Sequence, residues 1–150
     1  MCLCFKKIRW GKVVLAALLY LVIATVVHQI ETALTMRYYL MPEYFGVWSK
    51  VMMPKAGPPP TGFFLTSLVF SFIGGLVLAS FYDLAKDFLG KSCCSKTCGF
   101  VCWTVALSLV FFSLPAYLLL NLPLMLLVVW FISGAVILYL AALVFGKVLK

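Results

Sequence analysis

Charged residues are scarce in this chain, since they make up 11% of its 150 residues and only four of them are acidic. Hydrophobic residues reach 65%, against about 45–50% in soluble domains. So few polar side chains cannot cover the surface of a water-soluble globule, and the length leaves no room for a separate soluble domain. The single histidine also excludes a multi-histidine metal centre, or a haem held by two histidines, within one chain.

The motifs that mark common enzyme classes are absent as well. The sequence has no H-E-x-x-H metalloprotease motif, no glycine-rich phosphate loop and no G-x-S-x-G nucleophile elbow. It also has no C-x-x-C pair of the kind that forms or transfers disulfides. These absences favour a protein that is not an enzyme.

The chain does have four long apolar stretches. Each is long enough to cross ~30 Å of hydrocarbon as a helix, which takes about 20 residues. The stretches are Val13–Ile30, Gly62–Ala85, Gly99–Leu120 and Leu124–Phe145. We therefore expect an all-α fold in which residues 1–150 form a single transmembrane domain, a four-helix bundle. An outer loop, 32–61, and an inner loop, 86–98, connect the first three spans.

Positive charge lies mostly on one side of these stretches. Nine of the twelve basic residues precede the first span, separate the second from the third or end the chain: Lys6, Lys7, Arg9, Lys12, Lys86, Lys91, Lys96, Lys147 and Lys150. The other side holds Arg37, Lys50 and Lys55. The positive-inside rule therefore predicts cytoplasmic N- and C-termini in a multi-pass protein of the cell (plasma) membrane. Anionic lipid head groups, rather than nucleic acid, are the expected partners of the basic residues.

The connection 32–61 is apolar for a loop. Pro42 can begin a short helix whose apolar stripe would hold Tyr44, Phe45, Trp48, Val51 and Met52. We expect an amphipathic interfacial segment here, either on the outer leaflet or capping the bundle. In the third span, Pro115 predicts a kink.

Small residues recur at four-residue steps in the second span, at Ser67, Ser71, Gly75 and Ala79. Because lipid gives no hydrophobic drive for helix association, this stripe predicts a face on which another helix packs closely. The partner helix can belong to the same chain or to another. Asp83 and Asp87 end this span one turn apart, and we expect them on a solvated helix end rather than in a paired-carboxylate site.

The first span carries its ionisable residues on one helix face. His28 and Glu31 are three residues apart, so their side chains lie on the same side of a helix. Ionisable groups within a span mark functional sites by default, and this pair could relay protons or bind a cation. The alternative is an interfacial pair that packs and hydrogen-bonds against the outer loop.

Six cysteines lie on or near the predicted cytoplasmic side, where reducing conditions disfavour disulfides. Two are N-terminal, and four follow a CC-x₃-C-x₃-C pattern: Cys2, Cys4, Cys93, Cys94, Cys98 and Cys102. Thiolates of Cys93, Cys94 and Cys98 could bind zinc or copper, and methionines in the outer connection would suit copper passage. Cysteines beside lysines could instead accept acyl chains, or they are small apolar residues without a role. No other cofactor is expected.

Two segments of the chain carry a family resemblance. They are YYLMPEYFGVWSKVMMPKAGPPPTGFF, which is followed by a glycine-rich second span, and NLPLMLLVVW before the last span. Here the chain resembles small, uncharacterised four-span membrane proteins of prokaryotes. The resemblance implies the four-span fold and no particular activity. The cysteine clusters depart from it, which leaves an added metal or redox role open.

These patterns favour an integral membrane protein that acts through helix–helix or lipid contacts, as a subunit or a homo-oligomer. One alternative is a small transporter or channel that uses His28 and Glu31. Another is a metal-binding or redox membrane protein that uses the cysteines of the cytoplasmic face.

Overall fold

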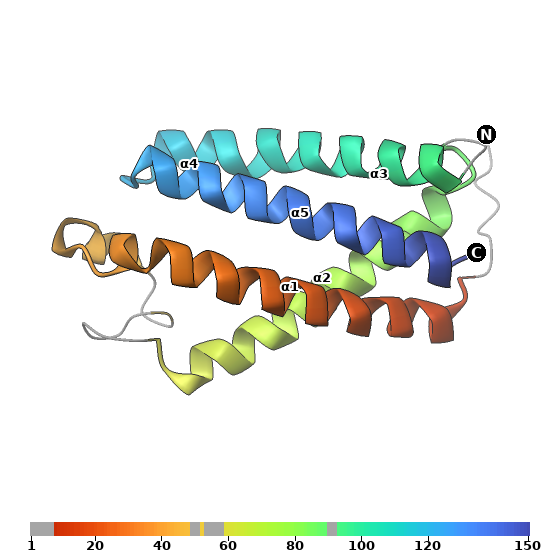
Figure 1. Ribbon diagram of the computed structural model, residues 1–150, viewed down its shortest axis with the longest axis horizontal. Coiled ribbons are helices and arrows are strands. Elements are labelled where there is room, and N and C mark those ends of the chain that lie inside the picture. Colours follow the sequence, from red (N-terminus) through yellow and green to blue (C-terminus); the bar gives the residue numbers. More distant parts are fainter. Residues whose placement is uncertain (1–7, 49–51, 53–58, 90–92) are drawn as a thin grey trace.

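The computed structural model describes residues 8–48, 52, 59–89 and 93–150, with side chains from residue 96 onward in the last range. The described residues form helices and connections, in the order shown in Figure 1. The elements are α1 (Trp10–Tyr39), the 3₁₀-helix η1 (Pro42–Val47), α2 (Thr61–Ala85), α3 (Cys93–Ser108), the π-helical η2 (Leu109–Ser113), α4 (Leu114–Leu119) and α5 (Leu124–Val148). The predicted all-α, four-helix membrane bundle is confirmed.

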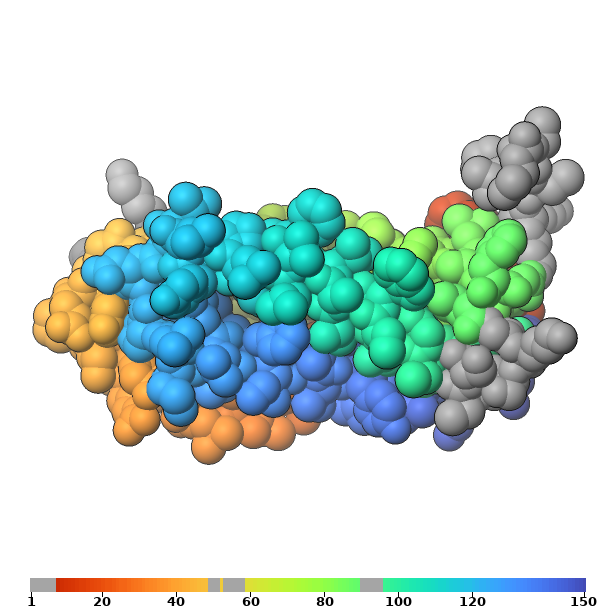
Figure 2. All heavy atoms as spheres, turned by 90° about the horizontal axis from the view of Figure 1, so that it is seen from above, coloured from red at the N-terminus to blue at the C-terminus, as the bar shows by residue number. Residues whose placement is uncertain are grey.

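Four helical stretches of the described chain are long and apolar enough to cross a membrane: Trp10–Tyr39, Thr61–Ala85, Lys96–Leu119 and Leu124–Val148. The first is longer than the predicted span, because α1 continues until the chain approaches Pro42, whose ring cannot enter a helix interior. The third combines α3, η2 and α4. Figure 2 shows the face that α3 and α4 form along the molecule. Exposed large apolar side chains on these elements include Trp103, Phe111, Leu118 and Leu119, as expected of a face in contact with lipid.

The helices pack in an order that differs from their order along the chain. α1 lies between α2 and α5, and α3 packs on the other side of α5. α1 begins and α5 ends at one end of the bundle, called the terminal end below. The other end, called the η1 end, holds η1 and the turn between α4 and α5. α2 crosses α1 obliquely and has few contacts with α5 (Figure 1).

Small residues on α1 and α2 allow these two helices to approach closely. A Cβ atom on Gly75 would lie 2.9 Å from Tyr20 Cδ1 and 3.0 Å from the carbonyl oxygen of Ala17. Ala79, one turn further along, is fully buried beside Val13 and Ala16 of the core. Close approach of two backbones is the usual basis of helix association in lipid, where burial of apolar surface gives no advantage.

Aromatic rings fill the core nearer the terminal end. Phe100 of α3 lies between Tyr82 of α2 and Phe145 of α5, with ring centroids 5.1 Å and 6.1 Å away, respectively. All three side chains are almost completely buried. Both of these ring pairs meet edge to face, which is a favourable geometry for aromatic pairs.

The terminal end also holds a cluster of three charged side chains around one backbone carbonyl, called the terminal clamp here. Its members are Arg9, Asp83, Lys86 and the carbonyl of Leu149. Arg9 Nη2 and Lys86 Nζ lie 3.1 Å and 2.8 Å from Asp83 Oδ1, and both donate hydrogen bonds to the Leu149 carbonyl. Asp83 is only 4% exposed. The prediction of a solvated helix end is therefore wrong for Asp83, because Arg9 just before α1 and Lys86 just after α2 compensate its charge inside the bundle. Asp87 is exposed, as that prediction requires.

A π-helical turn precedes Pro115, where the sequence predicts a kink. Pro115 lacks an N–H group, and its ring would clash with the carbonyl four residues earlier in a regular α-helix. The chain instead widens into η2 immediately before α4, which contains Pro115 in its first turn. A single π-helical turn lets the helix pass the proline without ending the membrane span.

Candidate functional site

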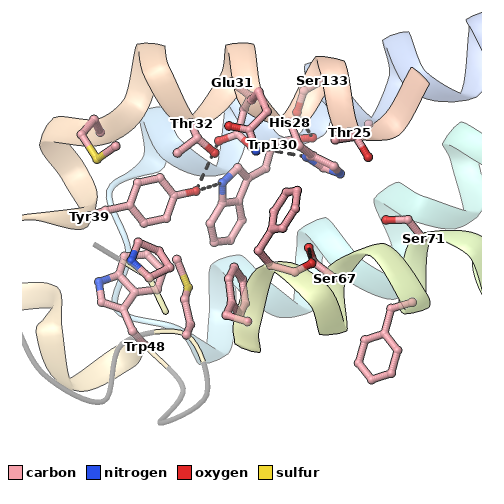
Figure 3. Close-up of a pocket in the computed structure, with 18 of the residues that line it drawn as sticks. Thr25, His28, Glu31, Thr32, Tyr39, Trp48, Ser67, Ser71, Trp130 and Ser133 are labelled. Carbon is pink, nitrogen blue, oxygen red and sulfur yellow. Dashed lines mark hydrogen bonds and ion pairs between the residues drawn. The ribbon is translucent and has the colours of Figure 1, made fainter. Parts of the chain in front are cut away.

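A cavity of about 750 Å³ lies at the η1 end of the bundle. Its walls come from α1, α2, α5 and the region where α3 meets η2, together with Trp48 directly after η1. In Figure 3, Thr25 and His28 lie on the α1 wall, and Ser67 and Ser71 lie on α2 across from them. Most of the remaining described lining is apolar: it includes Met36, Phe63, Phe64, Leu68, Phe112 and Phe131.

Glu31 places a buried carboxylate in the wall of this cavity. It is 7% exposed, and its Oε1 accepts hydrogen bonds from Thr35 Oγ1 at 3.0 Å and from the Tyr39 hydroxyl at 3.3 Å. The Tyr39 hydroxyl in turn accepts a hydrogen bond from Trp130 Nε1 at 2.9 Å (Figure 3). This chain of hydrogen bonds connects α1 to α5 and fixes the carboxylate in one orientation.

The second carboxylate oxygen of Glu31, Oε2, has fewer close partners than Oε1 among the described contacts. His28 Nδ1 lies 3.5 Å from Glu31 Oε2, and the His28 side chain is 55% exposed. The structure therefore brings the predicted pair together, with one member buried and the other open to the surroundings. A carboxylate oxygen can accept two hydrogen bonds, so Oε2 retains capacity for a further donor.

Three aromatic rings meet beside Glu31. The ring centroid of Tyr39 lies 5.0 Å from that of Trp48 and 6.5 Å from that of Trp130, and the two indoles are 6.3 Å apart. Trp48 belongs to the segment predicted as an amphipathic cap. This part of the segment packs against the bundle, as one of the two predicted arrangements requires.

Tyr39 and Trp130 are absent from the predicted site residues. A sequence signal for Tyr39 exists, because Glu31, Thr35 and Tyr39 continue the face of His28 at four-residue steps. For Trp130, the signal is weaker and rests on its indole N–H, which needs a partner inside an apolar bundle. Neither signal gives the contact between them, which joins residues 91 positions apart.

The small-residue stripe of α2 divides into two parts. Gly75 and Ala79 are buried against α1 of the same chain. Ser67 and Ser71, nearer the η1 end, line the cavity instead. Gly75 and Ala79 thus leave no open surface for a second copy, and assembly of several chains stays a prediction that would need other surfaces.

The cysteine hypotheses gain no new support. Cys98 and Cys102 carry free thiols and are exposed. Cys2, Cys4 and the side chains of Cys93 and Cys94 lie outside the described residues. Among the residues that the structure describes, no group of three histidine, cysteine or acidic side chains is placed to hold a metal ion. A zinc or copper site at Cys93, Cys94 and Cys98 stays a prediction.

Comparison of the chain with protein-family models, with curated proteins and with solved structures finds no match in any of the three. The resemblance to small four-span membrane proteins therefore stays an expectation from the sequence. Any statement about function depends on the chemistry of the cavity itself.

Proposed function

We propose that this protein binds a small amphipathic molecule in the cavity between α1, α2 and α5, as a multi-pass protein of the plasma membrane with cytoplasmic termini. The observation that carries the proposal is a cavity of about 750 Å³ around a buried carboxylate. Ligand sites in proteins commonly enclose about 300–1,000 Å³, with a mostly apolar lining and a few convergent polar groups. The lining described above has this composition.

The site supports a binding protein better than an enzyme. Glu31 has hydrogen-bond donors on one oxygen and His28 near the other. Serines also line the cavity, but Ser67 and Ser133 donate their hydrogen bonds to the backbone carbonyls of Phe64 and Trp130 and not to His28 or Glu31, as an activated nucleophile would. Binding is also the first step in a carrier, so the alternative of a small transporter that uses His28 and Glu31 follows from the same site. In this orientation the cavity lies in the outer half of the bundle, and exposed Lys12 and Lys147 face anionic head groups on the cytoplasmic side.

Photolabelling in nanodiscs tests the proposal. The probe is a neutral alkyl alcohol with a diazirine group, and the labelled peptides are identified by mass spectrometry. We expect labelling of cavity-lining peptides that an excess of the unreactive alcohol suppresses, because a site of fixed size saturates. Contact with lipid-facing residues such as Val69, which is 55% exposed, should not saturate.

A pair of substitutions on α2 provides the matched control. Ser71→Phe adds a ring to the cavity wall and should remove most of the suppressible labelling, whereas Val69→Phe adds the same ring on the exposed face and should leave it unchanged. Labelling that is insensitive to competitor in the wild type would count against a binding site. Equal labelling of the two variants would place the probe elsewhere.

A further inference from the structure

We infer that the ligand of this cavity is a lipophilic ammonium ion, an amine that carries its proton and an apolar body. This inference rests on the proposed function and assigns it a class of ligand. It starts from charge. Glu31 is the acidic residue among the described lining residues, and no lysine or arginine is described among them.

An ammonium group would compensate the charge of Glu31. A carboxylate within an apolar environment is costly unless a cation or several donors accompany it. His28 is the described partner that can carry a positive charge, and it is more than half exposed and 3.5 Å away. A cation that enters the cavity can therefore bring the closer charge that the protein itself does not provide.

The hydrogen bonds of Glu31 favour an ammonium with N–H groups. Oε1 already accepts from Thr35 and Tyr39, whereas Oε2 faces only His28 among the described contacts. A primary or secondary ammonium can donate to Oε2, and a hydrogen bond between charged groups is about twice as strong as one between neutral groups. A quaternary ammonium has no N–H to donate and would gain the charge attraction alone.

The rest of the lining determines the body of the ligand. Phenylalanine, leucine and methionine side chains from α1, α2 and η2 account for much of the described wall. Tyr39 donates a hydrogen bond to the carboxylate and Trp130 contacts Tyr39, and aromatic rings attract nearby cations. An apolar or aromatic group attached to the amine would therefore be buried, while its charge stays beside Glu31.

Other ligand classes fit less well. An anion would meet the charge of Glu31 with no lysine or arginine among the described lining residues. A metal ion prefers several carboxylate, imidazole or thiolate ligands, and the described residues offer no group of three. A neutral amphiphile fits the apolar walls but leaves the carboxylate uncompensated.

Calorimetric titration of the protein in nanodiscs of zwitterionic lipid tests this inference. The two probes are 2-phenylethylammonium and its neutral analogue 2-phenylethanol, and empty nanodiscs correct for partition into lipid. We expect the wild type to bind the ammonium about tenfold or more tightly than the alcohol, since both probes can donate a hydrogen bond to Glu31 but only the ammonium also compensates its charge. Glu31→Gln should remove this preference, whereas Glu43→Gln, an exposed site outside the cavity lining, should retain it.

The outcomes separate this inference from the proposed function. Equal affinity of the wild type for the two probes overturns the ammonium assignment, while suppressible photolabelling by the neutral alcohol would still support the cavity as a binding site. If neither probe binds and photolabelling is insensitive to competitor, both the ammonium assignment and the proposed binding function are rejected. Unchanged binding of 2-phenylethanol to Glu31→Gln shows that this variant is folded. If that variant does not fold, the wild-type comparison of the two probes decides.

Discussion

At the scale of single residues, the distinctive feature of this protein is a buried acid with an exposed histidine beside it. Glu31 is 7% exposed, whereas the His28 side chain is 55% exposed, although they lie one turn apart on α1. The difference arises because Glu31 faces α5 through Tyr39 and Trp130, and His28 lies at the cavity wall. Hydrogen bonds thus hold the carboxylate in one orientation, whereas the imidazole is exposed at the cavity wall.

A fixed positive charge in place of His28 should weaken ligand binding, because it would compete with the ammonium for Glu31. In His28→Lys the ammonium group of the lysine would lie at the cavity wall, one helical turn from the carboxylate. We expect the affinity for 2-phenylethylammonium to fall about two- to fivefold, as a partly exposed charge pair of ~0.5–1 kcal/mol implies.

The neutral variant His28→Gln is the control for this charge. Its affinity for the ammonium, measured by the same titration, should stay close to that of the wild type. An equal fall in both variants would assign the loss to removal of the imidazole and not to the added charge. His28 is exposed, so both variants should fold, and thermal unfolding checks this.

The residues of this site were only partly predictable. The spacing of His28 and Glu31 predicts a shared helix face, and the structure places them together. The hydrogen bonds that begin at Glu31 pass through Tyr39 to Trp130, which is distant in the sequence and lies on another helix. Periodicity describes one helix at a time, so it cannot show which neighbour a face will meet.

At the scale of elements, one half of α2 packs against α1 and the other half forms a wall of the cavity. The small residues of α2 continue at four-residue steps: Gly75 and Ala79 pack closely against α1, and Ser67 and Ser71 line the cavity. Toward the η1 end, the bulky side chains of Phe63 and Phe64 accompany the serines at the cavity. A close contact in one half and a cavity in the other follow from the same oblique crossing of α1 (Figure 1).

Adding one methyl group at Gly75 should destabilise the bundle. In Gly75→Ala the new Cβ would lie within 3.1 Å of the Ala17 backbone, so α1 and α2 must move apart. Overpacking of this kind costs about 1–3 kcal/mol. Gly74→Ala is the matched control, because no atom lies within 4 Å of its Cβ position. It should be neutral or up to ~1 kcal/mol more stable, since alanine favours helices.

Thermal unfolding of the two variants in one detergent measures this difference. Equal transition temperatures would show that α1 and α2 do not approach as closely at Gly75 as described. The larger change Gly75→Leu should also separate the helices, and native gels show whether it alters assembly as well. Loss of assembly in Gly75→Leu without loss of stability would support contact with a second chain.

At the scale of the whole molecule, the bundle is tightly packed at the terminal end and contains the cavity at the η1 end. The terminal clamp joins the start of α1, the end of α2 and the end of α5. The cavity occupies the η1 end, where α2 contributes one wall and α5 another. The number of membrane-spanning helices follows from hydropathy, although α1 is longer than its predicted span. The clamp does not, because Arg9 and Leu149 are 140 positions apart and become neighbours only in the folded bundle.

Neutralising the acid of the clamp should therefore destabilise the whole bundle. In Asp83→Asn, Arg9 and Lys86 would keep their charges and lose the carboxylate that compensates them, and Lys86 is itself buried. Removing one partner of a buried ion pair commonly costs about 3–5 kcal/mol, and partial exposure of Arg9 should reduce this to about 2–3 kcal/mol.

The exposed acid Glu43 provides the comparison, since Glu43→Gln removes the same charge at the η1 end. Its unfolding free energy should stay within about 0.5 kcal/mol of the wild type, as for most surface substitutions. The ammonium preference of the cavity should survive in Asp83→Asn wherever the protein is folded, because the clamp and the cavity lie at opposite ends. A wild-type unfolding free energy in Asp83→Asn would mean that α1, α2 and α5 are held together without the clamp, by the close contact at Gly75 and the apolar core.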